Sequence, residues 1–144
     1  MSVNQISIFV PNKAGWLGKV SRLLGDHGVN IRALSIADTT DFGILRLIVS
    51  DPARTGSVLR EAGLTATITE VVAVAVEDRP GGLATALRAL EDKGIGIEYL
   101  YGFVVQKEGD QALVVLRVED VTAAEGALAG AGVRVLGGDE VYRL

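Results

Sequence analysis

The hydrophobic positions at the start of the chain predict a strand followed by a helix. Residues 5–10 (QISIFV) are nearly all apolar, which is typical of a central strand, and Pro11 ends it because proline donates no ladder hydrogen bond. From Trp16 onward, apolar side chains fall at positions 16, 17, 20, 23 and 24, the spacing of one helix face. Gly28 then supplies the left-handed residue that commonly ends a helix.

Two further strands and a second helix are predicted next. Residues 31–37 and 44–50 are strand-like, and residues 38–43 between them contain the Asp, Thr and Gly residues that favour a turn. Asp51 can cap a second helix, which we expect to end near Gly63.

A β-rich segment over residues 64–76 completes the order βαββαβ. Because crossover connections in a sheet are right-handed, this order closes into a ferredoxin-like α+β sandwich, an antiparallel sheet of four strands with two helices on one face. The last segment permits two interpretations, since residues 65–76 could form one long strand or two strands divided near Thr69 and Glu70.

The second half of the chain repeats this pattern, which predicts two tandem domains, residues 1–70 and 71–144. The matched residues are Gly15 with Gly81, Gly28 with Gly94 and Ile31 with Ile97, each 66 positions apart, then Asp51 with Asp120 and Gly63 with Gly132, each 69 apart. The elements expected in the second copy are a strand at 71–76, a helix at 82–93, strands at 96–106 and 111–118, a helix at 121–131 and a strand at 133–136.

The end of the chain is predicted to add one more strand. The 69-residue spacing between the repeats matches residues 71–74, which are expected to form a strand, with residues 140–143. Residues 140–144 are therefore expected to be extended. An exposed strand edge needs a partner, which either the other repeat or another subunit would supply.

Composition narrows the classes of function. The formal net charge is −4 and the pI is near 5.0, which argues against a nucleic-acid partner because such proteins gather Lys and Arg on one face. No apolar run approaches the roughly 20 residues that cross a bilayer, and residues 1–5 lack the basic start of a secretory signal, so we expect no membrane partner and a cytoplasmic location. The chain has no cysteine and no His–carboxylate cluster with ligand spacing, so we expect neither a metal nor another cofactor.

Two copies of one motif carry a resemblance to a known family. Residues 78–83 (DRPGGL), followed after the helix by residues 94–97 (GIGI), closely resemble the ACT domain, whose hallmark is an acidic residue or Asn, then Pro-Gly-x-Leu, a helix and Gly-Val-Asn-Ile. The first copy resembles it through residues 12–17 (NKAGWL) and 28–31 (GVNI). The resemblance covers essentially the whole chain, as in a small stand-alone protein of two tandem ACT domains.

The resemblance implies binding of a free amino acid at the turn between the first strand and first helix, often across an interface between two such domains. The residues that it places at this site in the first copy are Asn12, Lys13, Ala14, Gly15, Trp16, Leu17, Asn30 and Ile31. A second possible site comprises Asp78, Pro80, Gly81, Gly82 and Leu83. The first copy departs from the pattern at Ala14, where proline is usual, and the second at Gly96, where Asn is usual. Because Gly96 lacks a hydrogen-bonding side chain, the first copy is favoured.

The chemistry of the turn suits an amino acid. A helix N-terminus offers exposed N–H groups and about half a positive charge to a carboxylate, and Gly15 lets a ligand approach the backbone. We expect Asn12 and Asn30 at adjoining ends of the first two strands, where their amides would orient the ligand. The alternative is that the glycines only turn the chain and the asparagines satisfy local backbone groups.

Several other side chains permit two interpretations. Trp16 could cover a ligand or pack at an interface, and Lys13 could pair with a carboxylate or be solvated. His27 is expected on the surface near the last carbonyls of its helix. The small row of residues 33, 35 and 37 matches a bulky row at 99, 101 and 103, so the rows could interlock between repeats, enclose a pocket or form ordinary sheet faces.

Three hypotheses for function follow. The first is an amino-acid sensor, expected to be a homodimer, that changes packing or partner affinity when ligand fills the turn. The second is an assembly subunit that binds an amino-acid biosynthetic enzyme without a ligand of its own. The third, an enzyme, is disfavoured because residues 11–16 hold only Lys13 where an acylphosphatase-like site needs an arginine cradle, and no nucleophile and base are paired.

Overall fold

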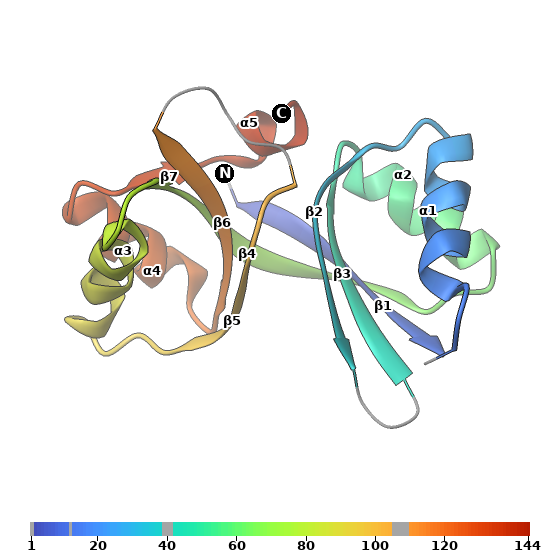
Figure 1. Cartoon of the computed structure of the whole chain (residues 1–144), viewed down its shortest axis with the longest axis horizontal. Coiled ribbons are helices and arrows are strands. Elements are labelled where there is room, and N and C mark those ends of the chain that lie inside the picture. Colours follow the sequence, from blue (N-terminus) through green and yellow to red (C-terminus); the bar gives the residue numbers. More distant parts are fainter. Residues whose placement is uncertain (1, 12, 39–41, 105–109) are drawn as a thin grey trace. The chain divides into compact units, whose positions relative to one another are not determined.

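The computed structural model describes residues 2–11, 13–38, 42–104 and 110–144. The chain divides into two compact units (Figure 1). The N-terminal unit comprises Asn4–Thr69, and the C-terminal unit comprises Glu70–Leu144 together with the start of the chain up to Val3. Each unit is built around its own hydrophobic core.

The N-terminal unit has the predicted order of elements. They are β1 (Val3–Pro11), α1 (Trp16–Asp26), β2 (Ile31–Asp38), β3 (Phe42–Val49), α2 (Pro52–Glu61) and the first residues of β4 (Ala66–Glu77). The strand order is β2-β3-β1-β4, with β3 antiparallel to both β1 and β2. The Phe9 N–H donates to the Thr65 carbonyl at 3.4 Å, just before β4 begins.

The core of this unit lies between the sheet and the two helices. Alternate residues of β1 and β3 point toward the helices, as the period of two in an extended strand requires. The buried residues of this core are Ile6, Ile8, Val10, Val20, Leu24, Val29, Leu45, Leu47, Val49, Val58 and Leu59. Burial of one such aliphatic side chain stabilises the fold by about 1.5–3 kcal/mol.

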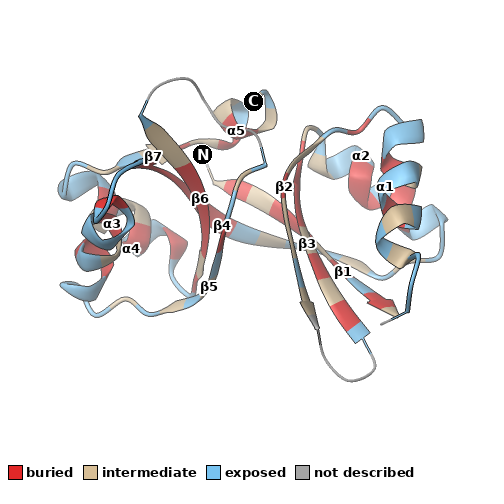
Figure 2. Cartoon of the chain, in the orientation of Figure 1, coloured by how far each residue is buried: buried red, intermediate tan, exposed pale blue. Residues whose placement is uncertain are grey.

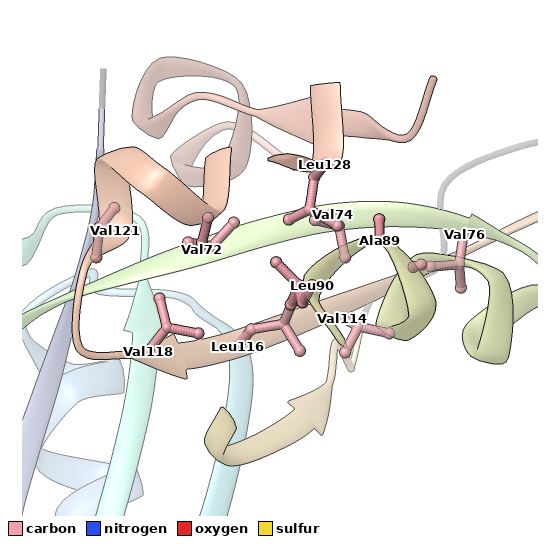
Figure 3. Close-up of a cluster of buried hydrophobic side chains, with 12 residues drawn as sticks. Val72, Val74, Val76, Ala89, Leu90, Val114, Leu116, Val118, Val121 and Leu128 are labelled. Atoms are coloured by element: carbon pink, nitrogen blue, oxygen red, sulfur yellow. The ribbon is translucent and has the colours of Figure 1, made fainter. Parts of the chain in front are cut away.

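The C-terminal unit repeats the plan. Its elements are the rest of β4, α3 (Gly82–Glu91), β5 (Ile97–Gly102), β6 (Gln111–Val118), α4 (Val121–Gly130), β7 (Arg134–Leu136) and α5 (Gly138–Tyr142). β6 pairs antiparallel with β4 and β5, and β7 pairs antiparallel with the other edge of β4. Side chains of β4 and β6 meet those of α3 and α4 in a core of branched aliphatic residues (Figure 3). In both units the buried residues gather where strands and helices face one another (Figure 2).

The helix caps agree with the sequence. The Asp51 carboxylate accepts from the Arg54 N–H at 3.1 Å at the start of α2, and the Asp120 carboxylate accepts from the Ala123 N–H at 3.0 Å at the start of α4. Gly28 follows α1 with a positive φ of 72°. The prediction of two tandem βαββαβ domains is thus confirmed, down to the signals that begin and end the helices.

Two predictions about the second half need correction or completion. Residues 140–144 do not form a strand, because the Glu140 and Val141 N–H groups both donate to the Gly137 carbonyl at 3.1 Å and begin the short helix α5. Val141, in this helix, is fully buried. The ambiguous segment 65–76 is one strand, β4. Parts of both predicted hairpin turns, residues 39–41 and 105–109, lie outside the described residues.

Candidate functional site

The turn between β1 and α1 has an open helix N-terminus. Gly15 is the N-cap residue in a left-handed conformation, with φ 93° and ψ −15°, which strains any residue bearing a Cβ. The Lys13 N–H donates to the Pro11 carbonyl at 2.8 Å, and the Lys19 N–H donates to the Gly15 carbonyl at 2.9 Å. The amides of Trp16, Leu17 and Gly18 therefore precede the first intrahelical bond.

Among the residues that the structure describes, no side chain caps α1 or α3, whereas aspartates cap α2 and α4. The two uncapped helices are the ones that follow the repeated turns, and each begins after a left-handed glycine, Gly15 or Gly81. Each aspartate satisfies one first-turn amide, and α1 and α3 have no such bond from a described side chain. At α3 the Gly82 N–H donates instead to the Arg79 carbonyl at 3.0 Å, within the turn itself.

A cavity of about 460 Å³ lies beside the β1–α1 turn. Five consecutive predicted residues line it: Lys13, Ala14, Gly15, Trp16 and Leu17. The rest of its wall comes from the end of β1 and from the neighbouring strands, through Val10, Pro11, Ile36 and Gly43. The cavity is therefore mostly apolar, with one cationic side chain and the open helix end at its rim.

The motif does not identify the strand residues of this wall. The pairing register places Gly43 opposite Val10, so the β2–β3 hairpin end stands beside the end of β1. A Cβ at position 43 would lie 3.5 Å from the Val10 side chain and 3.6 Å from that of Ile36. The antiparallel order alone predicts that the hairpin comes next to the turn, but identifying the wall residues requires the register.

Trp16 packs rather than standing free over the cavity. Its ring is half-buried against the core of the N-terminal unit, and the Lys19 ammonium lies 4.5 Å from the ring centroid, a cation–π contact. Leu17, by contrast, is exposed to 39%. The apolar surface offered to a ligand therefore comes chiefly from Leu17, Ile36 and the edge of Trp16.

Asn30 and Ile31 lie away from the turn within this unit. Ile31 pairs with Val49 and Val10 pairs with Gly43, two levels about 20 Å apart along β3. The expectation that Asn30 lies beside the end of β1 is wrong for a single unit, because Pro11 pairs with Phe42 at one end of β3 and Ile31 pairs with Val49 at the other. The backbone of Asn30 instead bonds Ser50, whose Oγ accepts from the Asn30 N–H at 3.0 Å. Asn12 lies outside the described residues.

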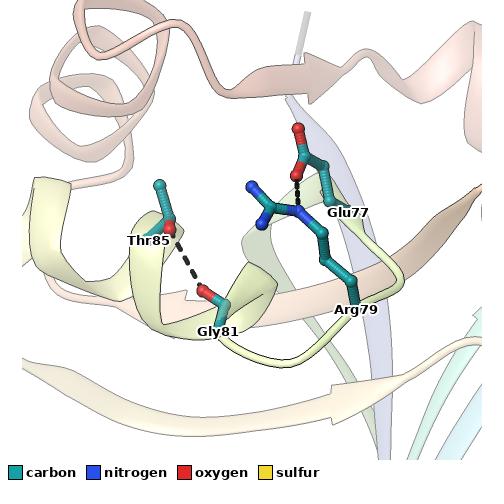
Figure 4. A network of polar contacts seen from close by, with 4 residues as sticks. All are labelled: Glu77, Arg79, Gly81 and Thr85. Atoms are coloured by element: carbon teal, nitrogen blue, oxygen red, sulfur yellow. Dashed lines mark hydrogen bonds and ion pairs between the residues drawn. The ribbon is translucent and has the colours of Figure 1, made fainter.

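At the equivalent turn of the C-terminal unit, a side-chain hydrogen bond and an ion pair hold the turn (Figure 4). Gly81 has nearly the same conformation as Gly15, with φ 85° and ψ −6°, and its carbonyl accepts from the Thr85 hydroxyl at 3.0 Å. Arg79 pairs with the Glu77 carboxylate. Gly82 is buried, and a Cβ there would collide with the Glu77 carbonyl oxygen, so the turn tolerates only glycine at this position.

The second predicted site is spread around this turn. Asp78, Pro80 and Leu83 are exposed, and the Asp78 N–H donates to the Asp110 carbonyl at 2.7 Å. A cavity of about 300 Å³ opens beside the turn, but of the five predicted residues it is lined only by Gly82. The two repeats therefore present different cavities at equivalent turns.

One further expectation is confirmed, and three other observations concern residue types that the sequence singles out. His27 donates from Nδ1 to the Leu23 carbonyl at 2.9 Å, which confirms its place at the end of α1. No metal-binding group of three His, Cys, Asp or Glu residues occurs within the described ranges, and no helix there is long and apolar enough to cross a membrane. Tyr99 and Tyr101 stack with ring centroids 6.4 Å apart, while the interlocking of the two rows stays a prediction.

Comparison with known proteins supports one family. A family model described as an ACT domain pair matches residues 1–132. The crystal structure of protein BT0572 from Bacteroides thetaiotaomicron is similar over 100% of this chain and 98% of that one, with 36% identity and a TM-score of 0.92. Curated protein sequences give no match.

Two more distant structures share the fold. The regulatory subunit of aspartate kinase from Thermus thermophilus has a TM-score of 0.68 at 18% identity, covering 91% of this chain and 93% of that one. The regulatory subunit of aspartate kinase from Thermus flavus has a TM-score of 0.62 at 19% identity, covering 92% and 94%. At this identity the likeness concerns the fold alone.

Proposed function

Because the chain belongs to the ACT domain pair family, we propose that it is a regulatory protein that binds a free amino acid at the β1–α1 turn of its N-terminal unit. One observation carries this proposal: a single cavity gathers the predicted residues from Lys13 to Leu17 around a helix end that no side chain caps. Its volume of about 460 Å³ falls in the range of small-molecule sites.

The helix end would hold the carboxylate. The open amides of Trp16, Leu17 and Gly18 carry the positive end of the α1 dipole, and the Lys13 ammonium adds a full charge at the same rim. Gly15 leaves its side of the rim bare, since even a Cβ there would meet no atom within 4 Å. Donors and space therefore coincide where a carboxylate would dock.

The cavity wall indicates the side-chain class. Val10, Leu17 and Ile36 are aliphatic, and the described lining contains no carboxylate. An apolar wall favours a ligand whose side chain is itself apolar, because a polar one would lose part of its water without gaining a partner. We therefore assign the site to an amino acid with an apolar side chain.

Asn30 and Ile31 would reach this ligand only from a second copy of the chain. Both lie about 20 Å from the turn within their own unit, so a site that uses them needs two copies. This requirement supports the proposal of a homodimer, and β2 offers an edge strand on which Ile36 is 55% exposed. Asn12 would belong to the same site by sequence, and residues 78–83 form the second candidate turn.

Regulation rather than catalysis is the proposed role, exerted in the cytoplasm. Ligand at a site shared between copies would favour the assembled state, which is how binding couples to partner affinity. The fold shared with aspartate kinase regulatory subunits favours one alternative, an assembly subunit for an amino-acid biosynthetic enzyme that needs no ligand. The two alternatives differ in whether a free amino acid binds the isolated chain.

A thermal unfolding screen against the standard amino acids tests the proposal. A ligand that binds only the folded chain raises Tm, by an amount that grows with its concentration. We expect apolar amino acids to raise Tm and Ala14→Glu, which adds a carboxylate at the rim, to abolish the effect. The matched control is Ala53→Glu, which adds the same charge to an exposed position in the first turn of α2. If no amino acid changes Tm, the proposal is contradicted and the alternative of an assembly subunit without its own ligand is favoured.

A further inference from the structure

The C-terminal unit contains a cavity that the N-terminal unit lacks in this form. It has a volume of about 300 Å³ and lies between the end of β4, the first turn of α3 and the turn that joins α4 to β7. Its polar side chains are Glu77, Arg79, Thr85, Gln111 and Arg134. They come from separate segments of the chain, and all belong to the same unit.

Two arginines and one glutamate give the cavity wall a net positive charge. Arg79 lies with its guanidinium between Glu77 and the first turn of α3 in the view of Figure 4, paired with the Glu77 carboxylate. Arg134, from the start of β7, pairs with Glu140 of α5, which does not line the cavity. Both pairs are partly exposed to solvent, so each is weak enough to exchange with a ligand.

The equivalent groove of the N-terminal unit is smaller, and its described lining holds one arginine, Arg22, rather than two. By the repeat, Gly82 and Thr85 correspond to Trp16 and Lys19, whose stacked side chains line a smaller cavity of about 230 Å³. Gly82 cannot carry a side chain because the Glu77 carbonyl occupies that position. The backbone of this turn therefore keeps a side chain out of the C-terminal cavity at position 82.

We propose that this cavity is a second binding site, which takes an acidic amino acid. The guanidiniums of Arg79 and Arg134 would each receive one carboxylate of the ligand, and the Glu77 carboxylate would receive its ammonium. The ligand's two carboxylates and one ammonium then match the wall's two cations and one anion in number and sign. Thr85 and Gln111 add neutral hydrogen-bonding groups to the wall.

This inference is independent of the site proposed at the β1–α1 turn. The two cavities share no residue, and the first has one charged side chain, Lys13, in a mostly apolar lining, while the second has three, Glu77, Arg79 and Arg134, among apolar and neutral polar residues. An amino acid without a second carboxylate leaves Arg134 with only Glu140, so the second site should discriminate against the ligands that the first prefers. The two sites can be lost separately by substitution.

Isothermal titration of the full-length chain with L-glutamate, L-aspartate, L-glutamine, succinate and inorganic phosphate tests the proposal. We expect glutamate or aspartate to bind at least tenfold more tightly than glutamine, which lacks the second carboxylate, and than succinate, which lacks the ammonium. Arg134→Gln should weaken the binding at least tenfold, whereas Arg88→Gln, at an exposed position of α3 outside the cavity, should not.

A second pair of variants guards against loss of folding. Thr85→Glu places a carboxylate in the cavity at an exposed position of the first turn of α3 and should abolish binding. It removes the exposed bond from the Thr85 hydroxyl to the Gly81 carbonyl, but a negative charge at this end favours the helix, so Tm should change little. Ala84→Glu adds the same charge one residue earlier, outside the cavity, and should leave binding intact.

Three results would overturn the inference. The first is the absence of heat with both acidic amino acids. The second is equal binding of succinate or phosphate, which would reduce the site to a general anion site. The third is binding of glutamate that survives Arg134→Gln and Thr85→Glu but is lost in Ala14→Glu, which would place the ligand in the N-terminal unit instead.

Discussion

At the scale of single residues, the site depends on glycines that allow a left-handed turn. Gly15 and Gly81 sit at matching positions of the repeat and have φ values of 93° and 85°. The amino-acid sequence alone predicts both positions, because a strand, a glycine turn and a helix recur in register. The side chains that complete each cavity, such as Ile36 and Arg134, come from other strands, and only the register brings them to the turn.

The substitution Gly15→Ala separates the conformational role of this glycine from its place at the cavity. An alanine at a left-handed φ costs about 1–2 kcal/mol, so the free energy of unfolding should fall by that amount. Gly94→Ala, at φ 68° with equally open surroundings in the C-terminal unit, should cost about the same. Only Gly15→Ala should also weaken binding of the amino acid that gives the largest Tm increase. We expect its affinity, measured by titration calorimetry, to fall at least fivefold. Equal affinities in the two variants would remove Gly15 from the site.

At the scale of elements, local signals predict the helices well and long-range placement poorly. Asp51 and Asp120 begin their helices as expected, since a carboxylate that bonds a first-turn amide is a purely local device. The strand predicted at the end of the chain is wrong because the repeat offset carries a strand onto Glu140, whereas Gly137 and the acidic residues after it favour a helical turn. The prediction for Asn30 fails because β1 and β2 both pair antiparallel with β3, so they run in the same direction and the end of one lies far from the start of the other.

The cap of α4 gives a prediction at this scale. Asp120→Ala removes the carboxylate that accepts from the Ala123 N–H and should lower the free energy of unfolding by about 1 kcal/mol, as measured by urea denaturation. Asp92→Ala changes the same side chain at an exposed position after α3, where no N-cap bond exists, and should have an effect below about 0.5 kcal/mol. Equal losses in the two variants would mean that the cap bond contributes nothing.

At the scale of the whole molecule, duplication has produced two units with one plan and two different surfaces at the repeated turn. Trp16 and Lys19 line a smaller cavity in the N-terminal unit, while Gly82 and Thr85 line a larger one at the equivalent place in the C-terminal unit. The N-terminal cavity is apolar around an open helix end, and the C-terminal one is charged. On the two proposals above, each unit of this ACT domain pair would bind a chemically different amino acid.

The most direct test of the central proposal is a backbone amide NMR titration of the isotope-labelled chain with L-leucine, L-isoleucine, L-valine and L-phenylalanine in turn. If an apolar amino acid docks at the β1–α1 turn, the amide signals of Gly15, Trp16, Leu17 and Gly18 shift with saturation, while that of Gly94, which follows α3 in the C-terminal unit and lines neither cavity, stays in place. Amide signals at this turn that remain unmoved by all four amino acids at saturating concentration would contradict the account.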